Sequence, residues 1–175
     1  MHGAGINVIV ATAYKSDASV GEGITYFPRF NFIETEGLSV SVGIPLSVAI
    51  SFSTGYYDSY YSSYYDASVG LVVNAPLIIN LNMGRGSTKE NRDKFGYFVG
   101  AGFGYHHGDF ITAGTDIYRD YTVAESINTF GPAANAGLRF GVGRKHQNVE
   151  VNFSYMKGIN ENKPNIFGVG CAFNF

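Results

Sequence analysis

The chain has one cysteine, few charged residues and no long apolar run, and each shortage excludes a class of protein. Cys171 alone forms no internal disulfide and supplies no multi-cysteine metal site. Charged residues make up 15% of the 175 residues, against roughly 25% in ordinary soluble domains. The formal net charge is −2, and no basic run with interleaved aromatic residues occurs, so nothing indicates a nucleic-acid partner.

Long apolar segments are missing as well. No stretch approaches 18 consecutive apolar residues, which excludes a transmembrane helix. Residues 1–10, MHGAGINVIV, lack the charged start, apolar core and cleavage site of a signal peptide. We interpret the sequence as a mature exported chain behind an added methionine, with residues 1–175 forming a single domain.

The chain is rich in segments where apolar and small residues alternate. From Leu38 to Phe52 every even position is apolar, and the odd positions are serine, glycine, proline or alanine. Eight segments have this period of two, which is typical of β-strands, and none has a convincing helical period. The predicted strands span residues 3–14, 23–33, 37–53, 67–82, 95–107, 128–142, 149–157 and 165–175.

The predicted connections alternate between two kinds, which an up-and-down arrangement of strands places at opposite ends. The first kind is mostly longer, is rich in tyrosine, aspartate and serine, and comprises 15–22, 53–66, 108–127 and 158–164. The second kind is shorter on average and comprises 34–37, 83–94 and 143–148. Counted together with Lys157, which directly precedes 158–164, the long set holds nine acidic and four basic residues, net −5. An acidic rim that binds divalent cations bridging lipopolysaccharide is one interpretation, and plain solvated loops are the other.

Alternation alone leaves open which face is inside. A soluble lipocalin-like barrel buries its apolar face, whereas a membrane barrel turns that face to lipid. The apolar faces of segments 37–53 and 67–82 are eight positions long, which suits membrane-spanning strands of roughly 9–11 residues better than soluble strands of about 5–6. The opposite face, mostly serine, glycine, alanine and asparagine, fits the narrow interior of eight strands. The sequence therefore predicts an all-β fold: an eight-stranded antiparallel up-and-down transmembrane β-barrel.

Aromatic residues fall near both predicted ends, as in the interfacial girdles of membrane barrels. We assign Phe95, Tyr97, Phe140, Phe173 and Phe175 to the short-turn end. We assign Tyr14, Tyr26, Phe52, Tyr105 and Phe130 to the long-loop end.

With eight predicted strands, short turns opposite long loops and a closing strand NIFGVGCAFNF, the chain resembles the small eight-stranded outer-membrane barrels, the class of OmpX and the membrane domain of OmpA. The resemblance covers essentially the whole chain. It implies a bacterial outer-membrane location, with long loops extracellular and termini periplasmic. It also implies insertion by the barrel-assembly machinery, which would read Phe175 and Phe173 as part of the assembly signal. It implies almost nothing about activity.

The stretch YYDSYYSSYYD, residues 56–66, is the most unusual in composition. Its six tyrosines are Tyr56, Tyr57, Tyr60, Tyr61, Tyr64 and Tyr65. Tyrosine with serine is typical of binding surfaces, because tyrosine offers a large contact area at a small entropic cost. We interpret the stretch as a surface-recognition loop or a contact with another outer-membrane protein. The alternative is a hairpin tip whose tyrosines belong to the outer girdle.

Three charged residues, Arg29, Arg139 and Glu150, occupy strand positions whose side chains point into the predicted barrel. A buried unpaired charge is very unfavourable, so we expect these groups to pair. The favoured interpretation is a structural ion cluster that plugs the lumen, and the alternative is a constriction that selects small ions. The adjacent His106 and His107 point to opposite faces of a strand and do not suit a shared metal. The segment GRGSTKEN lacks the order of a phosphate-binding loop and predicts a turn.

We expect a non-enzymatic, cofactor-free protein with a structural or surface-interaction role, such as an accessory subunit of a larger outer-membrane complex. Its expected partners are outer-membrane lipid and lipopolysaccharide. The main alternative is a narrow passive channel. A lipid-modifying enzyme and a soluble ligand-binding barrel are the remaining candidates.

Overall fold

The computed structural model describes residues 1–12, 16–59, 62–116, 119–142, 146–160 and 163–175. The strands are β1 (His2–Thr12), β2 (Ser16–Asp17), β3 (Ser19–Thr35), β4 (Leu38–Gly43), β5 (Leu46–Ser59), β6 (Ser62–Gly84), β7 (Phe95–Asp116), β8 (Arg119–Gly141), β9 (Asn148–Lys157) and β10 (Asn165–Asn174). Within these ranges no helix is both long enough and apolar enough to cross a membrane.

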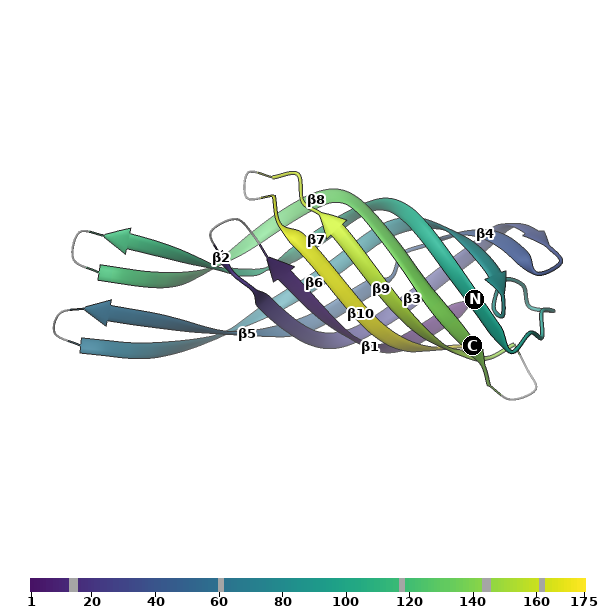
Figure 1. Cartoon of the computed structure of the whole chain (residues 1–175), viewed down its shortest axis with the longest axis horizontal. Coiled ribbons are helices and arrows are strands. Elements are labelled where there is room, and N and C mark those ends of the chain that lie inside the picture. Colours follow the sequence, from purple (N-terminus) through teal and green to yellow (C-terminus); the bar gives the residue numbers. More distant parts are fainter. Residues whose placement is uncertain (13–15, 60–61, 117–118, 143–145, 161–162) are drawn as a thin grey trace.

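The strands form a closed ring. All neighbours are antiparallel, and β1 pairs with β3 on one side and with β10 on the other, so the first and last strands complete the wall. Because β4 and β5 together make one wall strand, the wall has eight strands; among the described residues the two-residue β2 pairs with β7. The backbone nitrogen of Phe175 donates a hydrogen bond of 2.9 Å to the His2 carbonyl, so both termini lie at one end (Figure 1). The predicted eight-stranded antiparallel barrel is confirmed.

The apolar face points outward and the small polar face lines the lumen. On β5, Leu46, Val48, Ile50 and Phe52 are 42%, 41%, 50% and 69% exposed. The residues between them, Ser47, Ala49 and Ser51, are at most 5% exposed. A soluble barrel would show the opposite pattern. Closing the ring also pairs the backbone groups of the wall internally, as a lipid environment requires.

The continuous strand predicted over 37–53 is wrong, because Ile44 and Pro45 interrupt it between β4 and β5. Proline has no backbone N–H and cannot donate to a strand ladder. On the side of the break that faces β3, the Ile44 nitrogen donates to the Pro28 carbonyl at 3.2 Å. The apolar alternation continues across the break, so the period of two concealed it.

Two hairpins extend far beyond the barrel. The predicted loops 53–66 and 108–127 are wrong: β5 and β6 stay paired to Ser59–Ser62, and β7 and β8 to Asp116–Arg119. These hairpins project from the end opposite the termini, at the left of Figure 1. We call residues 53–72 and 108–129 the arms.

Exposed aromatic residues form belts near both ends, with one reassignment. The short-turn set is exposed, from 39% for Phe140 to 66% for Phe95, and at the arm end Phe52 and Phe130 are 69% and 49% exposed. Tyr26 is wrong as a member of the arm-end set. Its hydroxyl lies 2.7 Å from His2 Nδ1, at the terminal end. Tyr14 lies outside the described residues.

Candidate functional site

Arg29, Arg139 and Glu150 lie together in the lumen near the terminal end. Register places Arg139 and Glu150 directly opposite each other on β8 and β9, and Arg139 Nε donates to Glu150 Oε2 at 2.7 Å. Arg29 Nη1, from β3, lies 3.7 Å from the same carboxylate oxygen. The side chains of Arg29, Arg139 and Glu150 are 9%, 0% and 3% exposed, so the group is buried.

Side chains from other strands complete this ion cluster. Arg139 Nη1 donates to Asn82 Oδ1 at 3.0 Å, and the guanidinium lies 4.3 Å from the centre of the Phe98 ring. Asn174 Nδ2 donates to Glu150 Oε2 at 3.1 Å. Sequence reasoning missed Asn82 and Asn174, although both occupy inward-pointing positions of the alternation. Packing from four wall strands around one ion pair leaves a filled constriction.

A turn closes the terminal mouth of the lumen. Residues 84–88, which we call the plug turn, fold inward, and Arg85, Ser87 and Thr88 are at most 7% exposed. The Ser87 carbonyl accepts hydrogen bonds from Ser39 Oγ at 2.6 Å and Asn31 Nδ2 at 2.7 Å. Gly86 has a φ of +76°, which favours glycine, and its carbonyl accepts from Arg139 Nη1 at 3.3 Å. The predicted turn in GRGSTKEN is therefore also a plug.

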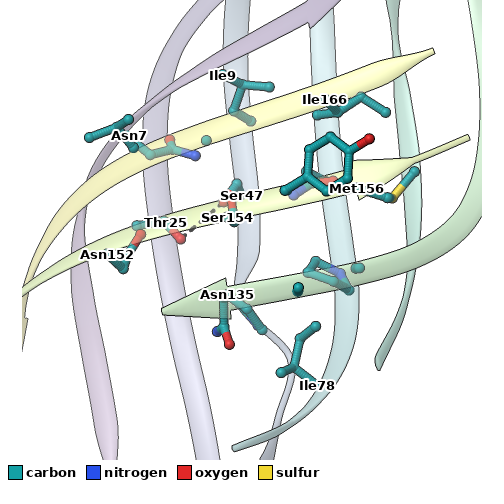
Figure 2. Close-up of a pocket in the computed structure, with 18 of the residues that line it drawn as sticks. Asn7, Ile9, Thr25, Ser47, Ile78, Asn135, Asn152, Ser154, Met156 and Ile166 are labelled. Atoms are coloured by element: carbon teal, nitrogen blue, oxygen red, sulfur yellow. Dashed lines mark hydrogen bonds between the residues drawn. The ribbon is translucent and has the colours of Figure 1, made fainter. Parts of the chain in front are cut away.

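A small cavity lies in the middle of the barrel, with both amide and apolar side chains in its lining (Figure 2). Asn7, Asn135 and Asn152 come from β1, β8 and β9, and Ser47 Oγ donates to Thr25 Oγ1 at 3.0 Å beside them. The cavity measures about 40 Å³. That volume accommodates a few water molecules, far less than the roughly 300–1,000 Å³ of ligand pockets.

The arm end of the lumen is also packed. His106 and Thr129 are 1% and 0% exposed on neighbouring strands β7 and β8. The chain after β9 folds over this end: the Gly158 nitrogen donates to the Pro164 carbonyl at 2.7 Å, and Pro164 is buried. His107 faces the other way, with Nδ1 3.0 Å from Asn128 Oδ1. Among the described residues no group of three or more His, Cys, Asp or Glu suits a metal ion.

Register brings the two arms together at their tips. Tyr57, Asp58 and Ser59 of β5 pair with Tyr121, Asp120 and Arg119 of β8. With their hairpin partners these segments make four adjacent strands, residues 62–64, 57–59, 119–121 and 114–116, which we call the tip sheet. Of the six candidate tyrosines, Tyr56, Tyr57, Tyr64 and Tyr65 lie on paired strand positions. Tyr60 and Tyr61 lie outside the described residues.

Phe173 and Phe175 lie at the terminal end of the last strand. They are 40% and 50% exposed, on the outward face. The Phe175 ring stacks on His2, with ring centres 6.4 Å apart. Both phenylalanines are thus accessible from the lipid side of the seam between β1 and β10.

No family model and no curated protein sequence matches the chain. Among solved structures it is similar to Ail, the attachment invasion locus protein of Yersinia pestis, with a TM-score of 0.54 and 14% identity over 99% of this chain and 96% of that one. The Ail complex with the heparin analogue sucrose octasulfate gives 0.52 and 18%, over 99% and 96%. Neisserial surface protein A gives 0.57 and 7%, over 98% and 93%. At these identities the likeness concerns the fold, which is that of the small eight-stranded outer-membrane barrels.

Proposed function

We propose that the chain is an integral protein of the bacterial outer membrane whose non-enzymatic barrel supports the arms as a surface for partner binding. One observation carries the proposal: the arms join into a single tip sheet above a lumen that is filled at both ends. A barrel that served mainly for passage would need a continuous path. A barrel that serves as an anchor needs only an apolar outer face.

The apolar outer face of the wall supports a membrane location. Outward residues in mid-wall, such as Val48, Leu71 and Val99, are 41%, 53% and 53% exposed, and in lipid that apolar surface is favourable. By analogy with small outer-membrane barrels, the arms face the exterior and the termini face the periplasm. Outer-membrane lipid and lipopolysaccharide then contact this apolar face and the aromatic belts at its two ends.

The close packing of the lumen favours a barrel that does not conduct ions over the alternative of a passive channel. An ion would have to separate Arg139 from Glu150 and displace the plug turn, and breaking a buried ion pair costs about 3–5 kcal/mol. Conductance in planar bilayers tests this point. We expect no discrete openings from the wild-type protein, whereas regular openings at low voltage would support the channel.

The arms supply free strand edges and an unusual composition. In the described pairings β6 meets β7 only from Val73 onward, so the outer part of β6 has an unpaired edge of the kind that accepts another strand. Eight of the chain's 13 tyrosines lie in the arms. Ail has been crystallised with a heparin analogue. The arms here hold six acidic residues and one basic residue, which opposes binding of such a polyanion.

Co-purification tests the role of the arms. The protein is isolated from native membranes in mild detergent beside a variant in which short turns replace residues 53–68 and 109–125. We expect wild type to retain a partner that the armless barrel loses. The control is the mobility shift of the unheated barrel on gels, which shows that the variant is folded. Equal retention by both proteins would contradict the proposal.

A further inference from the structure

The ion cluster carries more positive than negative charge. Arg29 and Arg139 share a single carboxylate, that of Glu150, and all three side chains are buried, so the net charge of the group is +1. An uncompensated charge in a protein interior is very unfavourable, and a counter-charge lowers its cost. The acidic side chains of the turns at the terminal end are exposed, where water and salt screen them: Glu34, Glu36, Glu90 and Asp93.

Arg29 has weak contacts for a buried guanidinium. Its Nη1 lies 3.7 Å from Glu150 Oε2, and its Nη2 lies 3.8 Å from Met1 Sδ. Its Nε has no hydrogen-bond partner among the described residues, and the same holds for Arg139 Nη2. Buried donors are normally paired. Two guanidinium groups that share one carboxylate oxygen therefore each have a spare N–H donor.

The central cavity approaches this cluster from the middle of the barrel. Its lining includes Phe27, which lies two positions before Arg29 on the inward face of β3. It also includes Asn152, which lies two positions after Glu150 on the inward face of β9 (Figure 2). Asn152 is 8% exposed, and its Nδ2 has no hydrogen-bond partner in the part of the chain that the structure describes. A third spare donor thus lies at the terminal side of the cavity.

We propose that the terminal side of this cavity binds one small inorganic anion with the size and charge of chloride, held by N–H donors of Arg29, Arg139 and Asn152. Three donors beside an excess positive charge select an anion, because hydrogen bonds to an ion of opposite charge are the strong ones. The volume of about 40 Å³ suits a monatomic ion and is too small for a phosphate ester. The unpaired oxygens Asn7 Oδ1 and Asn135 Oδ1 in the same lining make a bound cation the competing outcome, which the test includes.

The stability of the full-length protein in different salts tests the site. Urea unfolding in a non-ionic detergent is measured in sodium chloride and in sodium gluconate of equal ionic strength, since gluconate is too large for the cavity. We expect the urea midpoint to rise with chloride and then to level off. Chloride at a hundred times its dissociation constant should shift the folding equilibrium about a hundredfold. Equal midpoints in the two salts would overturn the proposal.

A second salt series separates an anion from a cation. Choline replaces sodium at constant chloride, and we expect the urea midpoint to stay the same. A midpoint that falls when sodium is removed would place a cation at the asparagine oxygens and would overturn the proposal.

Three variants assign the response to the cluster. Arg29→Met should abolish the response to chloride, whereas Arg92→Met removes the same charge at an exposed position of the same end and should retain it. Glu150→Gln raises the charge of the cluster by one, so chloride affinity should increase and chloride should offset part of the stability that this variant loses. A loss from Glu150→Gln of equal size in both salts, or a full response in Arg29→Met, would reject the site.

Crystals of the wild-type protein grown in bromide locate the ion without any variant. We expect an anomalous peak inside the lumen, in contact with Arg29 Nε. Bromide peaks confined to the outer surface would mean an adventitious ion only, and the proposal would fail.

Discussion

Arg139 and Glu150 sit directly opposite each other on β8 and β9 with 2.7 Å between Nε and Oε2, and both side chains are almost inaccessible to solvent. This pair is the centre of the network that fills the terminal half of the lumen. Glu150→Gln should therefore lower the free energy of unfolding by about 3–5 kcal/mol, because it leaves two buried arginines without a counter-charge. Urea unfolding in detergent, followed by circular dichroism, measures the change.

The control for Glu150 is Glu90→Gln, an exposed carboxylate in the connection after β6, which should change stability by no more than about 0.5 kcal/mol. Arg139→Met combined with Glu150→Met should regain part of the loss, since apolar replacement of a buried pair is often tolerated. A Glu150→Gln protein as stable as wild type would mean that the cluster is hydrated and contributes little.

Gly23 and Gly21 on β3 make a matched pair. A methyl group at Gly23 would press on the Val48 carbonyl and lie 2.6 Å from Ala49 Cβ, whereas at Gly21 the nearest atom is Val72 Cγ2 at 3.3 Å. We expect Gly23→Ala to destabilise the barrel by about 1–3 kcal/mol through overpacking, and Gly21→Ala to stay within about 1 kcal/mol of wild type. Urea midpoints compare them. Equal midpoints would contradict the close inward approach of β3 and β5.

The plug turn depends on a few side-chain bonds to one carbonyl. Ser39→Ala removes the 2.6 Å bond to the Ser87 carbonyl and should weaken the turn by about 1 kcal/mol. Hydrogen exchange at residues 85–88 should become roughly fivefold faster as a result. Thr35→Ala, at an exposed hydroxyl that bonds the Leu38 carbonyl at 3.3 Å, is the control and should leave that segment unchanged. Unaltered exchange in Ser39→Ala would show that other contacts hold the turn.

Phe175 and Phe95 are both exposed phenylalanines at the terminal end, but only Phe175 lies at the end of the closing strand. If the assembly machinery reads the last strand, Phe175→Ala should reduce the amount of folded barrel in cell membranes several-fold. Phe95→Ala should not, although it removes the same ring from the same belt. Quantitative blotting of the heat-modifiable form measures both. Equal yields would reject Phe175 as an assembly signal.

The alternation of apolar and small residues along each strand predicted much of the barrel from the sequence. Because side chains alternate strictly along a strand, the inward position of Arg29, Arg139 and Glu150 follows from their spacing. The same rule would have found Asn82 and Asn174 had small polar residues been treated as partners of charge. The alternation does not fix the register between strands, however. The 2.7 Å contact of Arg139 with Glu150 and the more distant position of Arg29 therefore could not be predicted without the structure.

The errors share a physical cause. In the arms the sequence does not keep a regular alternation of apolar and small residues, so the strands that the hairpin pairing forms there leave no period-two signal. Tyr26 was assigned to the wrong end because β3 begins at Ser19 rather than at residue 23, which moves Tyr26 away from the arm end of the strand. The plug turn is fixed by Asn31 and Ser39, which are remote in sequence from Ser87.

The outward direction of the apolar face is the central claim, and the native Cys171 tests it directly. Cys171 is exposed on the outward face of β10, between Val169 and Phe173. A nitroxide attached to Cys171 in lipid bilayers reports collisions with oxygen, which concentrates in hydrocarbon, and with a water-soluble nickel chelate. We expect frequent collisions with oxygen and few with nickel. Frequent collisions with nickel and few with oxygen would place Cys171 in water and contradict the account.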